Sequence, residues 1–505
     1  MRITLISLYP DLKAFGLRTL SACLKKEGHD VQLIFLQKRF NEKYKDRDLN
    51  LLVEISKESD LIGISLMTNF FDSAVQITQA LKNNCNIPVL WGGVHSTIRP
   101  EECLNYADMV CVGEGESSLV ELAKRIKEGE NYYDIRGIWF KDKLKIIKNQ
   151  ASSLVPELDA IPYQDYDFKT HYILDKGHFY QMDAERLNRD WSGTYTTMAT
   201  RGCPFGCSYC CNNTFNRMYA GQKLIRKRTI DNIMRELVEV KNRLPFIDCI
   251  LFDDDAFLLL YSESEIYEFC ERYKKEIGLQ LRITGIAPSA LTRNKLSLLV
   301  DAGLITIKMG IQSASERTKR LYGRFHSNDE VEKAARIINE FKYKIKMPHY
   351  DIILDNPWET NEDLIETLMF LAKIPPPYQV QYFSLTFYPG TELYEKAKRD
   401  GIITNDLQDV YRKDYFNFKK TYLKRLFFLL NEYAFYGVGI SPKQMFLLTN
   451  RKIIKTKMHL LLYIIFKLGT YPLKLKRLNN LLYEGLEDIK KGDWVAIRKK
   501  LFRWF

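Results

Sequence analysis

The stretch TYTTMATRGCPFGCSYC, residues 194–210, decides the fold of the middle of this 505-residue chain. Its first seven residues mix threonine with apolar side chains, which predicts a strand over 194–200. Three cysteines follow directly, at Cys203, Cys207 and Cys210. Since the loop after a strand is where a β/α barrel keeps its active site, the sequence predicts a ligand-binding loop at a barrel mouth.

Further strand patterns support the barrel, and each is followed by a helical pattern. They cover residues 249–252, 281–286, 305–311, 350–354 and 379–386. Six strand–helix units predict a partial, TIM-type (β/α)6 barrel over residues 193–400.

The region before the barrel, residues 1–150, predicts an α/β domain of a different kind. Short apolar strands at 2–8, 31–36, 61–66, 88–90 and 108–112 alternate with helical patterns. This alternation indicates a Rossmann-like, doubly wound parallel sheet, in which ligands bind beyond the carboxyl ends of the strands. Glycine loops at 92–93 and 113–115 follow two of these strands. They would let a large ligand approach bare backbone, or they would only permit tight turns. No G-x-G-x-x-G fingerprint is present, so an ordinary nicotinamide site is not predicted.

The remaining residues divide into a connector, 151–192, and a basic helical C-terminal region, 401–505. The C-terminal region contains 21 Lys and Arg against 8 Asp and Glu, whereas residues 1–400 contain 54 against 55. A composition of 46% hydrophobic and 27% charged residues excludes a disordered or collagenous protein. We expect a cytoplasmic protein, since the chain shows no secretory signal pattern and no apolar run of about 20 residues.

The three clustered cysteines have the spacing of ligands to one metal centre. Thiolates with three and then two residues between them can hold one iron–sulfur cubane from a single loop, and they leave one iron open to bind a substrate. Structural zinc is the alternative, but it usually needs four ligands, and no second pair of cysteines lies nearby. The adjacent Cys211 is interpreted as a packing residue.

This segment resembles the C-x-x-x-C-x-aromatic-C signature of the radical S-adenosylmethionine (SAM) enzymes, and its surroundings resemble their cobalamin-binding branch, over roughly residues 1–400. The resemblance implies a 4Fe-4S cluster on Cys203, Cys207 and Cys210, with Tyr209 beside the adenine of SAM. It further implies that SAM cleavage yields a 5′-deoxyadenosyl radical.

Other segments match the same family pattern. FDDDAF, residues 252–257, resembles the family's F-x-D-D-x-F and implies SAM contacts at Asp254 and Asp255, although a solvated acidic loop would look the same. GIQS, residues 310–313, resembles G-I-E-S and implies contacts at Gln312 and Ser313, with glutamine in place of the usual glutamate. DNPWET at 355–360 and YPGT at 388–391 resemble conserved turns of the barrel, with an aspartate replacing the first glycine of the former.

The loops of the first domain resemble the G-G-x-H-x-T and G-E-G-E loops of cobalamin-binding domains in this branch. The resemblance implies cobalamin contacts from the residues after the third, fourth and fifth predicted strands. These are Ser65, Thr68, Gly92, Gly93, His95, Gly113 and Glu114. The D-x-H-x-x-G motif that supplies a histidine below cobalt elsewhere is absent from the sequence. We expect His95 to shape its loop or to bond the edge of the ligand.

The resemblance implies methylation of an unactivated carbon of a small-molecule or lipid-like substrate. Cyclisation, rearrangement or oxidation with the same cofactors is the first alternative, and a non-catalytic cobalamin- or redox-sensing protein is the second. A reducing donor of the flavodoxin or ferredoxin type is expected as a partner. The C-terminal region suits either a helical cap packed on the barrel or peripheral contact with a membrane, whereas nucleic-acid binding is not expected because no recognisable module is present.

Overall fold

The computed structural model describes residues 1–143, 145–456 and 458–477. The chain forms two compact units. The first contains Met1–Ile305, Leu321–Arg324 and Leu385–Tyr415, and the second contains Thr306–Arg320, Phe325–Ser384 and Phe416–Phe505. The division falls among the residues of the predicted barrel, and the domain boundaries stay a prediction.

The first unit begins with a nine-stranded sheet in the order β7-β6-β5-β4-β3-β1-β2-β8-β9. Its parallel core consists of β1 (Arg2–Ser7), β2 (Asp30–Phe35), β3 (Leu61–Ser65), β4 (Val89–Gly92) and β5 (Met109–Cys111). All five lie where the apolar runs predict strands. The order 2-1-3-4-5 reverses between β1 and β3, which makes their carboxyl ends the switch point where such sheets bind ligands.

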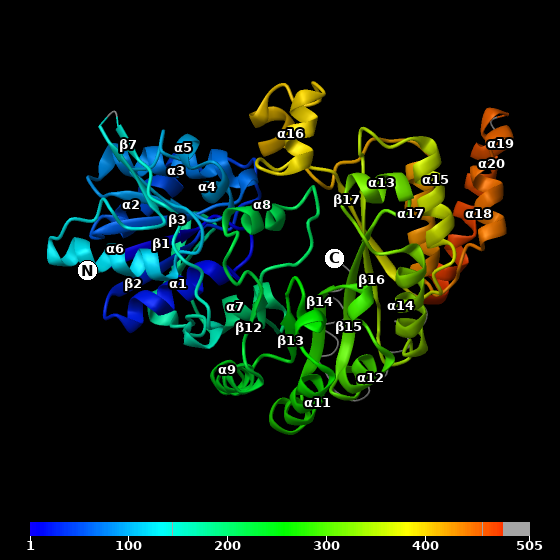
Figure 1. Ribbon diagram of the computed structural model, residues 1–505, viewed down its shortest axis with the longest axis horizontal. Coiled ribbons are helices and arrows are strands. Elements are labelled where there is room, and N and C mark those ends of the chain that lie inside the picture. Colours follow the sequence, from blue (N-terminus) through cyan, green and yellow to red (C-terminus); the bar gives the residue numbers. More distant parts are fainter. Residues whose placement is uncertain (144, 457, 478–505) are drawn as a thin grey trace. The chain divides into compact units, whose positions relative to one another are not determined.

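Helices connect these strands and cover both faces of the sheet (Figure 1). They are α1 (Phe15–Lys26), α2 (Asp46–Ser56), α3 (Phe71–Asn84), α4 (Val94–Ile98), α5 (Pro100–Cys103) and α6 (Glu116–Glu128). Helix α1 packs with α6, and α2 packs with α3. The two pairs take opposite faces because the connections run in opposite directions from β1.

The connector is partly strand, which the sequence patterns did not indicate. Strands β8 (His171–Asp175) and β9 (His178–Gln181) form a hairpin, and β8 pairs in parallel with β2. Lys176 and Gly177, at φ 49° and 76°, make its two-residue turn. On the other edge, β6 (Ile138–Asp142) and β7 (Lys145–Ile147) add an antiparallel hairpin. Helix α7 (Ala184–Trp191) ends the connector.

The barrel strands occur in the sheet order β10-β13-β14-β15-β16-β17, which confirms the α/β barrel. The strands of the first unit are β10 (Thr194–Thr197), β13 (Cys249–Phe252) and β14 (Gln280–Ile286), with a short hairpin of β11 (Thr200–Arg201) and β12 (Arg226–Lys227). Their helices are α8 (Cys211–Met218), α9 (Ile230–Arg243), α10 (Phe257–Leu260), α11 (Glu263–Arg272) and α12 (Arg293–Asp301). Helix α16 (Glu392–Arg399) lies in the 385–415 segment of this unit.

The second unit contains β15 (Leu304–Gln312, from residue 306), β16 (His349–Leu354) and β17 (Gln379–Ser384). Its helices are α13 (Glu316–Leu321, to residue 320), α14 (Asn328–Glu340), α15 (Asn361–Leu371), α17 (Tyr422–Phe435), α18 (Pro442–Thr449), α19 (Arg451–Lys455) and α20 (Met458–Leu468). Helix α17 packs on β17 and α15, as the cap interpretation expects. In the part of the chain that the structure describes, no helix is long and apolar enough to cross a bilayer.

Candidate active site

A cavity of about 450 Å³ lies within the first unit, at the carboxyl ends of β3, β4 and β5. Its wall includes five of the predicted cobalamin contacts and one predicted cluster ligand. They are Ser65, Gly92, Gly93, Gly113, Glu114 and Cys203. Residues of α1, of the connector and of α8 and α9 complete the wall. The structure therefore brings residues of the two sequence motifs, more than 80 positions apart, to one cavity.

Two glycines of the cobalamin loops adopt backbone that other residues rarely adopt. Gly93 has φ 98°, and a Cβ there would lie 2.8 Å from the carbonyl oxygen of Leu66. Gly113 has φ 95°, and a Cβ there would lie 1.8 Å from the hydroxyl of Tyr219. That hydroxyl accepts a hydrogen bond from the amide of Glu114 at 3.1 Å. The loop at 113–115 therefore needs a glycine at Gly113 to leave room for Tyr219, which follows α8.

His95 and Thr68 are not among the residues that line this cavity. The His95 side chain is fully buried, with Nδ1 3.1 Å from the hydroxyl of Thr68, and it packs edge-on against Phe71 and Tyr411. Burial, aided by the Arg99 charge, lowers the pKa of His95 to about 3, so the ring is neutral at pH 7. The geometry supports the loop-shaping role, and a contact of either residue with cobalamin stays a prediction.

The predicted cluster loop, residues 202–210, is fixed by backbone contacts to a distant segment of the first unit. The Ser208 amide donates to the carbonyl of Tyr322 at 3.0 Å, and the Ser208 hydroxyl donates to the carbonyl of Leu321 at 2.6 Å. The Tyr209 ring packs edge-on against Tyr322, with centroids 5.2 Å apart. Gly323, at φ 62°, would place a Cβ 2.8 Å from the carbonyl oxygen of Gly206. Residues 321–324 therefore form a backing for the loop that the sequence analysis missed.

The three cysteines differ in their surroundings. Cys207 is buried, and its sulfur lies 3.9 Å from the guanidinium of Arg324. Burial raises the pKa of Cys203 to about 12, so its deprotonation depends on the charge of a bound metal. A bond with Cys211, together with burial, raises the pKa of Cys210. Sequence reasoning had no signal for Arg324.

The three predicted ligands fit an iron–sulfur cubane, because a cubane takes each thiolate at a different iron. Among the residues that the structure describes, no three Cys, His, Asp or Glu side chains are grouped around one metal position. The bare backbone of Gly92 and Gly93 on the cavity wall likewise fits a ligand that approaches closely.

The two predicted SAM-binding aspartates are not equivalent. Asp254 is buried, and its carboxylate accepts bonds from the amides of Ala199 and Thr200 and from the Thr200 hydroxyl, at 2.6 to 3.1 Å. It therefore holds the chain that leads into the cluster loop. Asp255 accepts only from the side chain of Asn212 at 3.0 Å, next to Cys210 and Cys211. Of the two, Asp255 has the freer carboxylate.

Four charged side chains tie the second cobalamin loop to the hairpin that carries the cluster loop. Arg226 makes two bonds to the carboxylate of Glu114, at 2.5 and 2.9 Å, and its side chain is only 3% exposed. Arg201, two residues before Cys203, pairs with Glu116 at 2.6 Å and lies 3.5 Å from Glu114. Both carboxylate oxygens of Glu114 are engaged, and its amide and carbonyl bond Tyr219 and Ser152. Glu114 therefore holds the loop in place. Sequence patterns did not indicate these long-range pairs.

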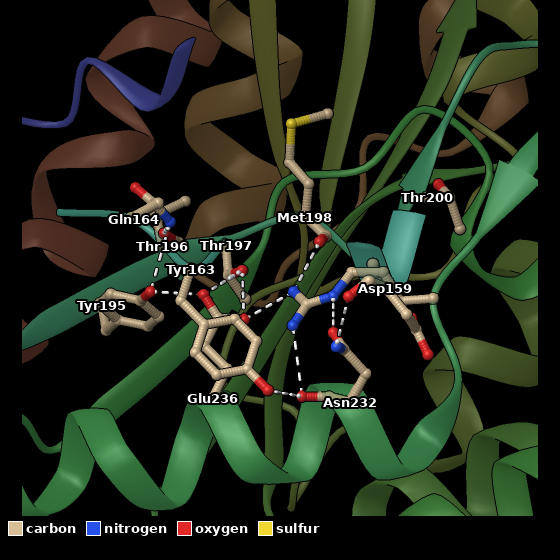
Figure 2. A network of polar contacts seen from close by, with 12 residues as sticks. Asp159, Tyr163, Gln164, Tyr195, Thr196, Thr197, Met198, Thr200, Asn232 and Glu236 are labelled. Carbon is tan, nitrogen blue, oxygen red and sulfur yellow. Dashed lines mark hydrogen bonds and ion pairs between the residues drawn. The ribbon is translucent and has the colours of Figure 1, made fainter. Parts of the chain in front are cut away.

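A second polar network forms part of the cavity wall, and Figure 2 shows it around Glu236 of α9. The Glu236 carboxylate accepts from Tyr195 at 2.6 Å, from Thr197 at 3.0 Å and from Arg228 at 2.6 Å. Arg228 also bonds Asn232 at 2.7 Å. The buried charges are thus paired and hydrogen-bonded, which stiffens this wall without leaving a free group for chemistry.

The remaining predicted residues lie in the second unit. Gln312 has φ 68° at a bulge between β15 and β16, and Ser313 is buried with its hydroxyl 3.2 Å from that of Thr367. Asp355, the residue that replaces a family glycine, keeps a left-handed backbone at φ 62° and forms a buried ion pair with Lys424 of α17. The unusual aspartate therefore has a partner in the C-terminal region.

Comparison with known families agrees with this geometry. Residues 197–371 match the model of the Radical SAM superfamily, and residues 1–123 match the B12 binding domain. The chain belongs to the cobalamin-binding radical SAM enzymes. The cofactors of this family are a 4Fe-4S cluster, SAM and cobalamin, as the resemblance implied.

The curated relatives of this radical SAM enzyme are all distant. An uncharacterized methyltransferase of Pyrococcus horikoshii is 26% identical over 76% of this chain and 78% of that protein. Bacteriochlorophyllide d C-8(2)-methyltransferase of Chlorobaculum tepidum is 26% identical over 68% and 70%. The anaerobic magnesium-protoporphyrin IX monomethyl ester cyclase of Cereibacter sphaeroides is 26% identical over 61% and 48%.

Two solved structures share the fold. The cobalamin-dependent SAM radical enzyme OxsB, with aqua-cobalamin and SAM bound, matches with a TM-score of 0.64 at 16% identity and covers 100% of this chain and 83% of its own. The radical SAM methyltransferase TsrM of Kitasatospora setae, with tryptophan substrate and a SAM analog, matches with a TM-score of 0.63 at 17% identity over 80% and 77%.

Proposed function

We propose that this radical SAM enzyme transfers a methyl group to an unactivated carbon of a small molecule. The proposal is carried by the cavity of the first unit, whose wall holds both the cobalamin loops and Cys203. When bound there, SAM on the cluster would supply a 5′-deoxyadenosyl radical, and cobalamin would supply the methyl group.

The chain's own residues bind and orient these groups. Cys203, Cys207 and Cys210 are the proposed cluster ligands, while Tyr209 and Asp255 lie next to them and would contact SAM. Asp254 would act through the strand it holds. Gln312 and Ser313 stay proposed SAM contacts of the second unit. Gly92, Gly93 and Gly113, with Ser65 and Glu114, would receive the corrin on the cavity wall.

The proposed partners follow from this chemistry. The substrate is a small or lipid-like molecule, in line with relatives named for acting on a bacteriochlorophyllide and with the tryptophan bound to TsrM. A reducing one-electron donor of the flavodoxin or ferredoxin type would serve the cluster. We propose a cytoplasmic protein with peripheral membrane contact through its C-terminal region.

The test compares two neighbouring cysteines after anaerobic purification. Cys203→Ala should lose the cluster's iron, sulfide and absorbance together with the formation of 5′-deoxyadenosine, because one of three ligands is gone. Cys211→Ala is the matched control and should keep all of them. Retained cleavage of SAM in Cys203→Ala would refute the ligand assignment.

The mass of the product separates methylation from the other radical outcomes. A gain of one CH2 unit supports methyl transfer, whereas an unchanged skeleton with a new ring or a loss of hydrogen supports the cyclase-like alternative, which the similarity to the Cereibacter sphaeroides cyclase favours. If a complete holoprotein forms no 5′-deoxyadenosine, the non-catalytic sensor alternative replaces both.

A further inference from the structure

Helix α20 is apolar on all sides, which is unusual for a helix on the outside of a protein. Its sequence is MHLLLYIIFKL, with one charged residue in eleven. A helix that is hydrophobic all round is normally buried in a core or against lipid. The described structure buries none of its residues.

One face of α20 is accounted for by α17. The ring of His459 lies 4.5 Å from that of Tyr422, and the hydroxyl of Tyr433 donates to the carbonyl of Phe466 at 2.7 Å. This inner face attaches the helix to the rest of the second unit. The face of α20 opposite to α17 therefore points outward.

The outward face carries several exposed apolar side chains. Leu461, Ile464, Ile465 and Leu468 are each more than half exposed, and Phe446 of α18 and Leu475 after α20 are 61% and 60% exposed. We call these six residues the α20 face. Patches of this kind mark interaction sites on soluble proteins. The cap interpretation thus holds for α17 but not for this face of α20.

The charge around the α20 face identifies its partner. The sequence contains no acidic residue between Glu432 and Glu484, whereas residues 442–477 contain nine Lys and Arg. Glu432 pairs with Lys467 and Lys474, and Arg451 pairs with Glu362. Lys443, Lys452, Lys455 and Lys476 are exposed. Exposed lysines beside an apolar helix face are complementary to anionic headgroups over acyl chains.

We propose that the α20 face docks on an anionic lipid surface, with its apolar side chains in the headgroup boundary and the neighbouring lysines on the headgroups. The inference deepens the proposed peripheral contact and rests on it, but it does not depend on the radical chemistry. It indicates that the enzyme works at the membrane surface on a lipid-soluble substrate.

The test measures co-sedimentation of the full-length holoprotein with phosphatidylcholine vesicles, with and without about a third phosphatidylglycerol. We expect binding to the anionic vesicles that weakens with added salt. Ile464→Asp with Ile465→Asp should abolish binding. Lys452→Gln with Lys455→Gln should weaken it roughly 30-fold, since each lysine near the surface contributes about 1 kcal/mol.

The controls use exposed residues elsewhere in the second unit. Tyr343→Asp, and Lys333→Gln with Lys346→Gln, should bind vesicles as the parent does, since these exposed positions lie outside the α20 face. Cluster content and SAM cleavage should be unchanged in every variant, which separates this proposal from the proposed chemistry. Equal binding by parent and Asp variant would overturn it. A dimer that the Asp variant abolishes would also overturn it, because the α20 face would then bind a second copy of the chain. Hydrogen-exchange protection of α20 without vesicles would overturn it as well, because the face would then be covered by a second copy or by residues 478–505.

Discussion

The Glu114–Arg226 pair offers a direct measure of how firmly the second cobalamin loop is joined to the cluster hairpin. Arg226 is 3% exposed and Glu114 is 19% exposed, and the two bonds between them are bidentate. Burial opposes ionisation of Glu114, but the bonds from Arg226 and the charge of Arg201 outweigh it and lower its pKa. The pair is therefore fully charged at pH 7.

Removal of either partner leaves a charge with too few contacts. Losing one partner of a buried pair costs about 3–5 kcal/mol. We expect the lower end, about 3 kcal/mol, because Glu114 keeps Arg201 at 3.5 Å and Arg226 keeps the carbonyl of Val155 at 2.8 Å. Glu114→Gln with Arg226→Met should cost clearly less than the two single changes combined, with a coupling of about 2 kcal/mol.

The assay is urea unfolding of the four anaerobically purified proteins, with cobalamin affinity measured in parallel. The control cycle uses Glu332 and Arg336 on α14, an exposed pair at 2.7 Å that should couple by only about 0.5 kcal/mol. We expect the single variants to bind cobalamin more weakly, because the corrin loop loses its anchor. A coupling no larger than that of the control pair would show that the tie does not position the loop.

Three further changes test other parts of the site. Gly113→Ala should destabilise the fold by at least about 1 kcal/mol more than Gly129→Ala. Both glycines have positive φ, but only a Cβ at Gly113 meets a tyrosine hydroxyl. Urea unfolding midpoints and cobalamin uptake check this. Burial raises the pKa of Asp254 from 3.8 to about 6. Between pH 3.8 and 6 the folded protein keeps a proton that the unfolded chain releases, so the free energy of unfolding falls as the pH rises. This fall amounts to about 3 kcal/mol, and Asp254→Asn should remove it. Unfolding measured from about pH 4 to 7 checks this. Asp355→Gly should destabilise the fold by about 2 kcal/mol, because it leaves Lys424 buried and unpaired, although glycine relaxes the backbone there. A second change, Lys424→Met, should restore the stability. An Asp355→Gly variant as stable as the parent would contradict this.

Sequence patterns predicted the elements whose signal is local. The five parallel strands lie within one or two residues of the apolar runs that indicated them, because buried parallel strands are apolar on both faces. The β8–β9 hairpin was missed, since its strands are short and mix polar with apolar residues. The signal that could have found it is the Lys176-Gly177 pair between two alternating segments.

Non-local contacts could not be predicted. Nothing near Arg226 or Arg324 indicates that one meets Glu114 and the other meets Cys207, because each pair joins residues more than 100 positions apart. The motif residues themselves were easier to find than their supports. Even there, the pattern did not separate Asp254, whose oxygens the backbone occupies, from Asp255.

The 385–415 segment determines when the first unit can be completed during synthesis. It follows the sixth barrel strand, yet its Tyr411 donates to Glu102 at 2.6 Å and accepts through its carbonyl from Asn69 at 3.2 Å. A nascent chain on the ribosome lacks these two hydrogen bonds until about four-fifths of its length has been translated. Because domains tend to fold as they emerge, the cobalamin-binding half lacks these contacts during most of elongation, and we expect cobalamin to bind only after the 385–415 segment has been made.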